Sequence, residues 1–528
     1  MSTFVGLTSN TTINALLWGW KWDTTSLTYS MPNDANGYGQ YEGLQTDGNF
    51  QHPGTGQFNP FAIKSMNTAA FRPDIIKVMK NFSDVCGLTL TEDASGNITS
   101  LRFAQVDLFD ASIGDGDNPH APGRQDTDTT RSSAEAFPPD PNFPNQFSNH
   151  AHGDNWFNDR FNDANPGSFE YSAWMLHEPG HALGLKHGHI SQTINGTTYP
   201  QLPTSVDSQE FSIMTYRRFV GQSANDLGGD NASDYATTLM MLDIRALQFL
   251  YGADYSTNSG NTIHRWSPTN GHYLVNGVDQ GGHTNPKAGS VIFMTVWDGG
   301  GRDTYDLSLY KTATKIDLQP GNWTTTAKSQ RADLDFSDGA GKHLARGNIA
   351  NALLFNNDLR SLIEDAKGGS GNDSIYGNQG KNQLSGNGGN DFIRGLTAND
   401  TLYGGSGNDS LDGGVGVDTM TGNAGRDLFV FRTIQESRLT TNTSDLIRDF
   451  SHSSGDRLHL SNIDAVSGSG NQSFDFIGKS GFNHSGQVRY TWANNDTYVW
   501  LNTDSDRTAE MMFRLDGKKT LVAGDFIL

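Results

Sequence analysis

A repeat with a period of nine residues dominates the second half of this 528-residue chain. Seven successive copies begin at Gly368, Gly377, Gly386, Gly395, Gly404, Gly413 and Gly422. The sixth position of the copies is Asp373, Asn382, Asp391, Asp400, Asp409, Asp418 and Asp427, and the eighth is Ile375, Leu384, Ile393, Leu402, Leu411, Met420 and Phe429. A glycine-rich linker would not keep an apolar residue in phase over seven copies. We therefore predict a solenoid whose glycines permit the φ values of tight turns and whose apolar residues point inward from short strands.

The period also predicts how the acidic residues stack. Two nonapeptides make one coil of a parallel β-roll, so turns eighteen residues apart share an edge. One edge then holds Asp373, Asp391, Asp409 and Asp427, and the other holds Asn382, Asp400 and Asp418. Stacked carboxylates repel one another unless a hard cation lies between them, and calcium takes roughly six to eight oxygen ligands. We therefore predict several structural Ca²⁺ ions. Besides these residues, the predicted ligands in the repeats are Gly369, Gly371, Asn378, Gly380, Gly386, Asn387, Gly389, Gly395, Ala398, Gly404, Gly405, Gly407, Gly413, Gly414, Gly416 and Gly425.

The acidic balance of the chain excludes some classes of partner. The sequence has 37 basic and 58 acidic residues and a net charge of -21, which opposes nucleic-acid phosphates and anionic lipid. No apolar stretch reaches the roughly 20 residues of a membrane span, and Met1–Phe4 lacks the basic and apolar regions of a signal peptide. The single cysteine, Cys86, excludes intramolecular disulfides and is expected to be a buried thiol. We expect a monomer without nucleic-acid partners and without a membrane span.

The first half of the chain mixes helical and strand patterns. Residues 27–31 and 98–106 are expected to be strands, and residues 74–85 carry helical periodicity. Residues 110–167 form a long polar segment rich in Asp, Asn, Pro and Gly, which is expected to be mostly loop and to serve a site.

The second half has strand patterns only, with short apolar runs at 291–296, 315–318 and 352–355. The sequence therefore predicts an α+β chain of two domains. These are a mixed α/β domain over residues 1–252 and an all-β domain over 253–528, with the nonapeptide repeats at 368–430.

The motif His177-Glu178-x-x-His181-x-x-Gly184-x-x-His187 lies in the first half. Residues four apart share a helix face, so His177 and His181 can hold one ion while Glu178 faces its water. Gly184 allows the chain to turn out of the helix and return His187 as a third ligand. Three imidazoles leave an open position for water, which is typical of a catalytic zinc site with Glu178 as general base.

Downstream, Ser212-Ile213-Met214-Thr215-Tyr216 resembles the Met-turn of the metzincin clan. The chain as a whole resembles the serralysins, the metzincin family that joins this zinc motif to a calcium β-roll. The resemblance implies a zincin-like catalytic domain in which Met214 forms the apolar floor under the zinc. Tyr216 would ligate zinc at rest and stabilise the oxyanion during attack. Residues 243–252 would be the helix that closes this domain, and Ala134, Glu135 and Ala136 would be the edge strand that pairs with an extended polypeptide substrate.

Segments outside the regular repeats match further calcium-binding segments of that family. The ligands that this resemblance implies are Asn258, Gly260, Thr262, Asp298, Gly300, Gly301, Asp303, Leu362 and Glu364. Asp449 and Asp456 are additional candidates beyond the repeats.

The nonapeptides also resemble the repeats-in-toxin of proteins exported by one-step ABC transporters. In that class the export signal is C-terminal and uncleaved, and often has an acidic residue followed by apolar ones. The tail Asp525-Phe526-Ile527-Leu528 matches this pattern. The resemblance implies type I secretion from a Gram-negative bacterium, an ABC-type exporter as partner and an extracellular location.

Two residues depart from the family pattern. Pro179 stands where an aliphatic residue is usual, and Gly188 stands where proline is common. A proline inside a helix lacks the N–H that would bond to the carbonyl of Met175, at a usual cost of about 3 kcal/mol. We expect a kink that disturbs the alignment of His177 and His181 and reduces activity without preventing zinc binding.

The combined motifs predict a secreted zinc endopeptidase in which Glu178 takes a proton from the attacking water and passes it to the leaving amine. Two alternatives come from other classes. One is a calcium-dependent binding or adhesion protein whose protease domain is impaired by Pro179, and the other is a purely structural β-roll protein. The intact zinc motif and Tyr216 argue against both, because a site that drifts usually loses its Glu or a ligand first.

Overall fold

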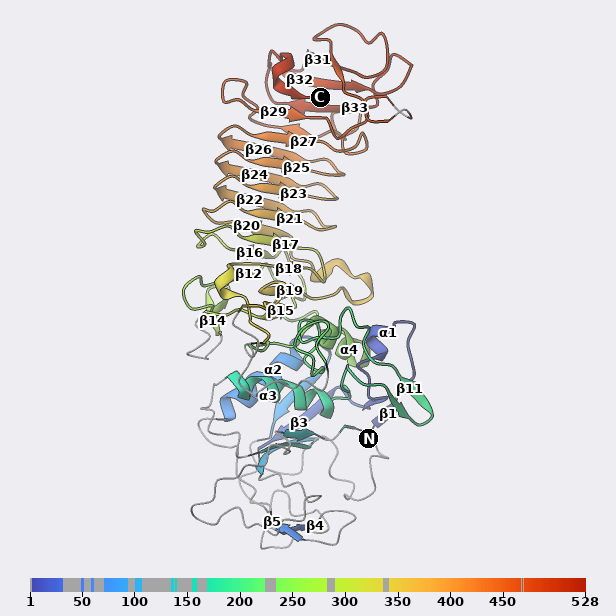
Figure 1. Cartoon of the computed structure of the whole chain (residues 1–528), viewed down its shortest axis with the longest axis vertical. Helices are drawn as coiled ribbons and strands as arrows, with labels where there is room; N and C mark the ends of the chain where they lie inside the picture. The colour runs from blue at the N-terminus through green and yellow to red at the C-terminus, as the bar shows by residue number, and fades with distance from the viewer. Residues whose placement is uncertain are drawn as a thin grey trace.

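The computed structural model describes residues 2–31, 49–51, 58–60, 71–93, 100–106, 134–136, 138–139, 154–158, 169–223, 234–282, 290–335, 341–466, 468 and 470–528. Most of the loop predicted over residues 110–167 therefore lies outside the described residues. In the described part, the half that contains the helices lies at one end of a long molecule. A stack of short strands follows it, and an antiparallel sheet lies at the far end (Figure 1).

A five-stranded sheet with the order β6-β3-β7-β9-β8 forms the centre of the first half. Its strands are β3 (Ser26–Ser30), β6 (Thr89–Glu92), β7 (Leu101–Val106), β8 (Ala134–Ala136) and β9 (Asp154–Asn158). The first four strands in this order are parallel, and β8 pairs antiparallel with β9 at the edge. The strands predicted at 27–31 and 98–106 correspond to β3 and β7.

Four α-helices are described in this half: α1 (Thr11–Asn14), α2 (Arg72–Ser83), α3 (Phe169–Ala182) and α4 (Met241–Tyr251). Helix α2 has proline in its first turn, where the missing N–H costs nothing, and Asp74 there favours the helix dipole. Its buried face includes Val78 and Phe82, as the periodicity predicts. Helix α4 is followed by Gly252, whose φ of 83° would be strained for a residue with a side chain.

The short strands of this half are β1 (Ser2–Phe4), β2 (Trp20–Trp22), β4 (Asn49–Gln51), β5 (Phe58–Pro60), β10 (Gln192–Ile194) and β11 (Thr197–Tyr199).

The second half is all-β in its described residues, apart from short 3₁₀ turns. Before the repeats come β12 (Ile263–Trp266), β13 (Tyr273–Val275), β14 (Val278–Gly281), β15 (Met294–Val296), β16 (Thr304–Asp306), β17 (Lys315–Asp317), β18 (Trp323–Thr324), β19 (Ile349–Asn351) and β20 (Asp365–Lys367). The repeats form β21 (Ser374–Tyr376), β22 (Gln383–Gly388), β23 (Phe392–Arg394), β24 (Thr401–Ser406), β25 (Ser410–Asp412), β26 (Thr419–Ala424) and β27 (Leu428–Val430). Beyond them lie β28 (Leu446–Ile447), β29 (Arg457–His459), β30 (Asp475–Phe476), β31 (Gln487–Ala493), β32 (Asp496–Asn502), β33 (Met511–Leu515) and β34 (Phe526–Ile527).

The repeats form the predicted β-roll. Even-numbered strands β20 to β26 follow one another in one parallel sheet, and odd-numbered strands β21 to β27 follow one another in the other. The register advances by eighteen residues per coil, since Ser374 pairs with Phe392 and Phe392 pairs with Ser410. All seven eighth-position residues are fully buried and form the core between the sheets. The fold class and the inward direction of the apolar residues are thus confirmed.

The role predicted for the repeat glycines needs correction at the first position of each copy. None of these seven glycines has φ in the left-handed region. They are required for space, because a Cβ on Gly386 would overlap Oδ2 of Asp391 and lie 2.7 Å from the carbonyl oxygen of Gly404. Left-handed glycines occur instead at the second and fourth positions, at Gly389, Gly405, Gly407, Gly414 and Gly425.

One predicted strand is wrong. Residues 352–355 are not a strand, because the strand is the preceding β19, which pairs with β15 and ends at Asn351. The side chain of Asn351 donates to the carbonyls of Asp317 and Gln319, and a 3₁₀ turn starts at Phe355. In that turn Asn356 has φ of 53°, which is incompatible with a strand.

One hydrophobic core joins the two halves of the chain. The core cluster of the first half includes Cys86, Met214 and helix α4, and it continues into Phe293 and Trp297. Cys86 is buried as predicted, and burial raises the pKa of its thiol to about 12. None of the helices in the described part of the chain has the length and apolar character needed to cross a bilayer.

The fourth repeat contains a strained alanine that generates a stability prediction. Ala398 has φ of 80° at the position where other copies have glycine. Ala398→Gly should raise the free energy of unfolding by roughly 0.5 kcal/mol, because relief of left-handed strain of about 1–2 kcal/mol exceeds the added entropy cost of glycine, about 0.5–1 kcal/mol. Chemical denaturation in calcium would measure the change. Ala424→Gly, at a residue without positive φ, is the control and should destabilise; a loss of stability in both variants would contradict the strain at Ala398.

Candidate functional site

Helix α3 and the loop after it bring the predicted zinc ligands together. His177, Glu178 and His181 lie in the last turns of α3 and are buried. The chain leaves the helix at Gly184, which has φ of 100° and would place a Cβ 2.5 Å from the carbonyl oxygen of Trp20. The turn returns His187 to the other two histidines.

The Nε2 atoms of the three histidines form a triangle with sides of 3.1 Å. Nδ1 of His177 lies 2.7 Å from the carbonyl oxygen of Ile213, and Nδ1 of His181 lies 2.9 Å from that of Leu185. A carbonyl can only accept, so both rings carry their proton on Nδ1 and direct an Nε2 lone pair at the other. Such facing lone pairs require a cation, and three imidazole nitrogens are ligands that zinc prefers. The residues present therefore fit a zinc ion.

The electrostatics of the triangle favour metal binding over protonation. Burial lowers the pKa of His177 to about 3 and that of His181 to about 4, with the neighbouring imidazole adding to the effect on His177. Burial also lowers the pKa of His187. All three rings are therefore neutral near pH 7, the state in which imidazole binds a metal.

The predicted disturbance of the helix by Pro179 is not seen in the positions of the ligands. Helix α3 continues through Pro179 to Ala182, and the backbone N–H of Leu183 donates to the carbonyl of Pro179 over 3.0 Å. His177 and His181, on either side of the proline, remain aligned on one face. The other departure, Gly188, is explained by packing, since a Cβ there would lie 2.5 Å from Cδ1 of Leu202.

The Met-turn lies against the zinc ligands. The backbone of Gly180 in α3 approaches Met214 so closely that a Cβ would lie 2.7 Å from its Sδ. The N–H of Gly188 donates to the carbonyl of Met214 over 2.8 Å. Met214 is fully buried, as an apolar floor requires.

Buried Asp243 of α4 holds the Met-turn in place. Its carboxylate accepts from Oγ of Ser212 over 2.6 Å and from the backbone N–H groups of Ile213 and Met240 over 2.8 and 3.0 Å. The carbonyl of the same Ile213 is the partner of His177. Asp243 therefore holds the backbone of Ile213, the residue whose carbonyl orients the predicted zinc ligand His177, whereas the sequence resemblance had limited its helix to closing the domain.

Tyr216 lies beside the triangle, as the Met-turn pattern predicts. Its ring centroid is 4.5 Å from that of His187 and 5.9 Å from that of His177. His189, which sequence reasoning missed, lies beside both rings, with its centroid 4.5 Å from that of Tyr216 and 5.2 Å from that of His187. Nδ1 of His189 accepts from the backbone N–H of Tyr216 over 3.3 Å.

Lys186 is a second residue that sequence reasoning missed. It is fully buried beside His187, and its ammonium donates to the carbonyls of Ala15, Ile190, Pro200 and His187 over 2.7 to 3.1 Å. Burial lowers the pKa of this ammonium to about 8. Lys186 thus ties the segment after α1 to the loop that carries the third zinc ligand.

The predicted substrate strand lies next to helix α3, which carries the predicted zinc ligands. Strand β8, residues 134–136, is an edge strand of the five-stranded sheet and contacts α3. The free edge of an antiparallel strand can pair with an extended peptide.

The predicted calcium segments before the repeats also meet. The Thr262 hydroxyl lies 3.1 and 2.9 Å from the carbonyl oxygens of Asn258 and Gly260. Asp303 accepts from the N–H of Thr262 and its own N–H donates to Glu364, both over 2.8 Å. A Cβ on Gly301 would overlap the carbonyl of Gly260, so the loops are in close contact. The loop of Asp298, Gly300, Gly301 and Asp303 and the segment of Leu362 and Glu364 therefore converge on the loop of Asn258, Gly260 and Thr262.

The carboxylates in this group fit a cation. Burial raises the pKa of Asp298 to about 6 and the pKa values of Asp303 and Glu364 to about 7. Oδ2 of Asp303 is buried and has no hydrogen-bond partner among the described residues. His264, missed by sequence reasoning, lies with Nε2 3.0 Å from Oδ2 of Asp298 and Nδ1 2.6 Å from the hydroxyl of Tyr273. It orients one of the predicted ligands.

The aspartates of the repeats form two regular columns. In each column, one carboxylate oxygen accepts from the backbone N–H of the residue eighteen positions earlier, as Oδ1 of Asp391 does from Asp373 over 2.7 Å. The other oxygen is buried and has no hydrogen-bond partner in the described part of the chain at Asp391, Asp400, Asp409, Asp418 and Asp427. These unsatisfied oxygens fit a hard cation between the turns. Asp449 and Asp456 differ, because both oxygens of each accept backbone N–H groups.

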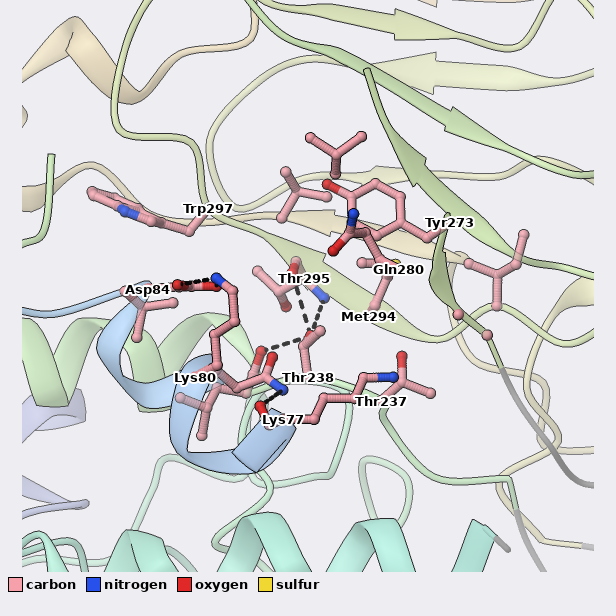
Figure 2. A pocket seen from close by; sticks show the side chains of 18 of the residues that line it. Lys77, Lys80, Asp84, Thr237, Thr238, Tyr273, Gln280, Met294, Thr295 and Trp297 are labelled. Carbon is pink, nitrogen blue, oxygen red and sulfur yellow. Dashed lines mark hydrogen bonds and ion pairs between the residues drawn. The ribbon is translucent and has the colours of Figure 1, made fainter. Parts of the chain in front are cut away.

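A separate cavity of about 390 Å³ lies where the two halves meet. Figure 2 shows Lys77 and Lys80 of α2 on one side of it, with Tyr273 and Gln280 of the β13–β14 hairpin on the other. Lys80 is paired with Asp84, and Thr238 bonds to Thr295. The cavity contains none of the predicted zinc ligands. A smaller cavity of about 40 Å³ lies beside His177 and Tyr216.

Comparison with known proteins gives one family and a set of relatives. Residues 253–528 match the family described as Peptidase M10 serralysin C terminal. Metalloprotease AprA of Pseudomonas entomophila (strain L48) is 31% identical over 62% of this chain and 56% of its own length. Serralysin C of Dickeya chrysanthemi is 33% identical over 42% of this chain and 40% of its own length, and serralysin of Proteus mirabilis is 28% identical over 61% and 56%. This chain spans about half the length of the curated relatives that it matches.

One solved structure is also similar in part. The solution structure of the AlgE6R3 subunit from the Azotobacter vinelandii mannuronan C5-epimerase covers 31% of this chain and 78% of that chain, at 22% identity and a TM-score of 0.16. A TM-score of this size supports no conclusion.

The tight turn after α3 generates a first prediction for the site. Gly184→Ala should lower the free energy of unfolding by more than about 2 kcal/mol, because left-handed strain of about 1–2 kcal/mol adds to the clash with Trp20. It should also weaken zinc binding, since the turn carries His187. Gly196→Ala is the matched control, with φ of 74° and nothing within 4 Å of an added Cβ. Equal losses in the two variants, measured by denaturation and zinc competition, would refute the clash.

Pro179 generates a second prediction. Pro179→Ala should stabilise the protein by about 1–3 kcal/mol, because it returns a helical N–H without adding volume at a buried position. Zinc affinity should stay within about twofold, a change of under about 0.5 kcal/mol, since the three nitrogens already converge. Pro179→Ile restores the same N–H but also adds volume. The difference in stability between the Ile and Ala variants therefore measures the effect of packing, separately from that of the hydrogen bond. Tenfold tighter zinc binding in Pro179→Ala would show that the proline misaligns the ligands after all.

Proposed function

The chain belongs to the serralysin family of M10 peptidases, and we propose that it is a secreted, zinc-dependent endopeptidase that hydrolyses peptide bonds of extracellular proteins. The observation that carries the proposal is the triangle of Nε2 atoms from His177, His181 and His187, in which at least two lone pairs face each other. Their fixed tautomers leave a cation as the partner that satisfies them.

A zinc ion bound there would polarise the scissile carbonyl and acidify the attacking water. Glu178 follows His177 in the same buried turn, so its carboxylate can take the water proton and pass it to the leaving amine. Tyr216, beside His187, can donate its phenolic proton to the developing oxyanion. No covalent intermediate with the protein is expected.

The substrate would bind as an extended polypeptide along β8. In the described residues β8 is the last strand of its sheet and contacts α3, so backbone hydrogen bonds could hold the substrate close to Glu178. Binding along β8 would tolerate many substrate sequences, because hydrogen bonds between two backbones do not depend on the side chains of the substrate.

The second part of the proposal concerns the β-roll. We propose residues 1–252 as the catalytic domain and 253–528 as a calcium-binding domain that is exported by an ABC-type transporter with the C-terminal tail as its address. The unsatisfied carboxylate oxygens of the roll support calcium, and the net charge of -21 argues against nucleic-acid partners. A monomer is proposed.

The catalytic role of Glu178 has a direct test. Glu178→Gln should lower casein hydrolysis by about 10²–10⁴-fold, because it removes the base and leaves every zinc ligand in place. Zinc content, measured by mass spectrometry of the purified protein, should stay at the wild-type level. Glu92→Gln, at a carboxylate paired with Arg72, is the control and should keep full activity. Turnover by Glu178→Gln close to that of the wild type would refute the mechanism.

The calcium proposal predicts the effect of a chelator. Removal of calcium should unfold the roll cooperatively, because its stacked buried carboxylates would then repel across empty turns. Circular dichroism should show loss of β structure in chelator and recovery when calcium returns. A melting curve that does not change in strong chelator would contradict calcium binding by the roll.

A further inference from the structure

The two residues that flank Tyr216 in the chain are bound to one buried carboxylate. The hydroxyl of Thr215 donates to Oδ1 of Asp207 over 2.5 Å, and the guanidinium of Arg217 pairs with Oδ2 of the same carboxylate. Asp207 is 1% exposed, so its end of both contacts is shielded from water, where charge-assisted hydrogen bonds are strong. The carbonyl of Arg217 also accepts from the N–H of Gln209 over 2.8 Å. The backbone before and after Tyr216 is therefore held in place.

A histidine side chain contacts both the backbone and the ring of Tyr216. Nδ1 of His189 accepts from the N–H of Tyr216 over 3.3 Å, which leaves the proton of the neutral imidazole on Nε2. The centroids of the two rings are 4.5 Å apart, and the rings meet at an angle of 31°. One residue earlier, the N–H of Gly188 donates to the carbonyl of Met214 over 2.8 Å. Both hydrogen bonds join the loop that carries His187 to the Met-turn.

The proposed chemistry of Tyr216 requires a well-placed hydroxyl. A donor stabilises a developing oxyanion only at hydrogen-bond distance, and a displacement of about 1 Å can cost roughly 100-fold in rate. A tyrosine side chain turns about its own Cα, so a fixed backbone sets the arc on which the hydroxyl moves. A second ring stacked on the phenol limits how far it turns along that arc.

We propose that Asp207 and His189 are positioning residues for Tyr216. Asp207 fixes the backbone about which the side chain turns. His189 holds the peptide N–H and stacks on the ring, which keeps the phenol beside the triangle of zinc-binding nitrogens. This inference rests on the proposed role of Tyr216 as a donor to the oxyanion, and it adds two residues that lie outside both sequence motifs.

A purely structural role makes a different prediction. If Asp207 and His189 only stabilise the fold around the Met-turn, the loss of activity on substitution does not depend on the hydroxyl of Tyr216. If they position that hydroxyl, the loss disappears once the hydroxyl has been removed. Double-mutant cycles with Tyr216→Phe separate the two cases, because this substitution keeps the N–H and the ring.

The zinc-loaded full chain provides two readouts for these cycles. The first is the pair of constants kcat and KM for a peptide substrate. The second is the dissociation constant of a phosphinic peptide, whose tetrahedral phosphinate resembles the transition state. His189→Phe keeps an aromatic ring and removes the acceptor nitrogen. Asp207→Asn keeps an oxygen for Thr215 and removes the charge that pairs with Arg217.

Each single variant should lower kcat by about 3–10-fold with little change in KM, which corresponds to the net contribution of one hydrogen bond. The phosphinic peptide should bind more weakly by a similar factor. In the Tyr216→Phe background, the same substitutions should change both quantities by less than about twofold. Thr215→Val removes one of the two contacts of Asp207 at nearly unchanged shape and replaces Asp207→Asn if that variant does not fold.

Zinc content and a control variant complete the test. Zinc measured by mass spectrometry should stay at the wild-type level, because neither positioning residue is a predicted ligand. His272→Phe changes a half-buried histidine paired with Asp279 and should leave both readouts unchanged. Equal losses with and without the Tyr216 hydroxyl would overturn the positioning role, and so would unchanged kcat and phosphinate affinity in the single variants. A wild-type chain that neither cleaves peptides nor binds the phosphinic peptide would instead overturn the proposed function itself.

Discussion

The structure depends on the neutralisation of carboxylates that the fold itself places in a low dielectric. Each nonapeptide contributes a single apolar side chain to the core of the roll, so hydrophobic burial per residue is modest. Five aspartates of these coils, Asp391, Asp400, Asp409, Asp418 and Asp427, bury a carboxylate oxygen that has no hydrogen-bond partner in the described residues. A buried, unpaired charge costs several kcal/mol, and a column of them repels in addition. If the roll binds calcium as proposed, its free energy of folding includes the binding energy of the cations.

The first half of the chain is ordered in a different way, by a set of close backbone contacts around one turn. Gly180, Gly184 and Gly188 each stand where a Cβ would clash, with Met214, Trp20 and Leu202 respectively. These contacts place the helix, the third ligand and the Met-turn against one another without a rigid linker. Buried Asp243 then fixes the backbone of Ile213, whose carbonyl contacts His177. The two halves also share a core, since Phe293 and Trp297 belong to the same hydrophobic cluster as helix α4, so folding of the roll is expected to stabilise the first half.

Sequence reasoning succeeded where a short period or a dense motif carries the structure. The repeat predicted the roll, its register and the inward side chains, and the zinc motif predicted which histidines converge. It failed where tertiary contacts decide. Lys186 looks like a surface residue, yet four carbonyls surround its ammonium. His264 and His189 carry no local pattern, because their partners are 34 and 27 residues away. The expected strand at 352–355 failed because pairing with β15 stops at Asn351.

The proposed export signal and the folded roll exclude each other. Phe526 and Ile527 form β34, the last strand of the seven-stranded sheet, and pair in parallel with β29. Asp525 is buried, accepts from the N–H of Val522 over 2.8 Å and contacts His452. An exporter cannot read a tail that is part of a sheet, so recognition requires that the end of the roll be unfolded. Because the carboxylate columns destabilise the roll when cations are scarce, low calcium inside the cell would keep the tail accessible, and calcium outside would fold it into place. The proposed dependence of the roll on calcium would then also place export before folding.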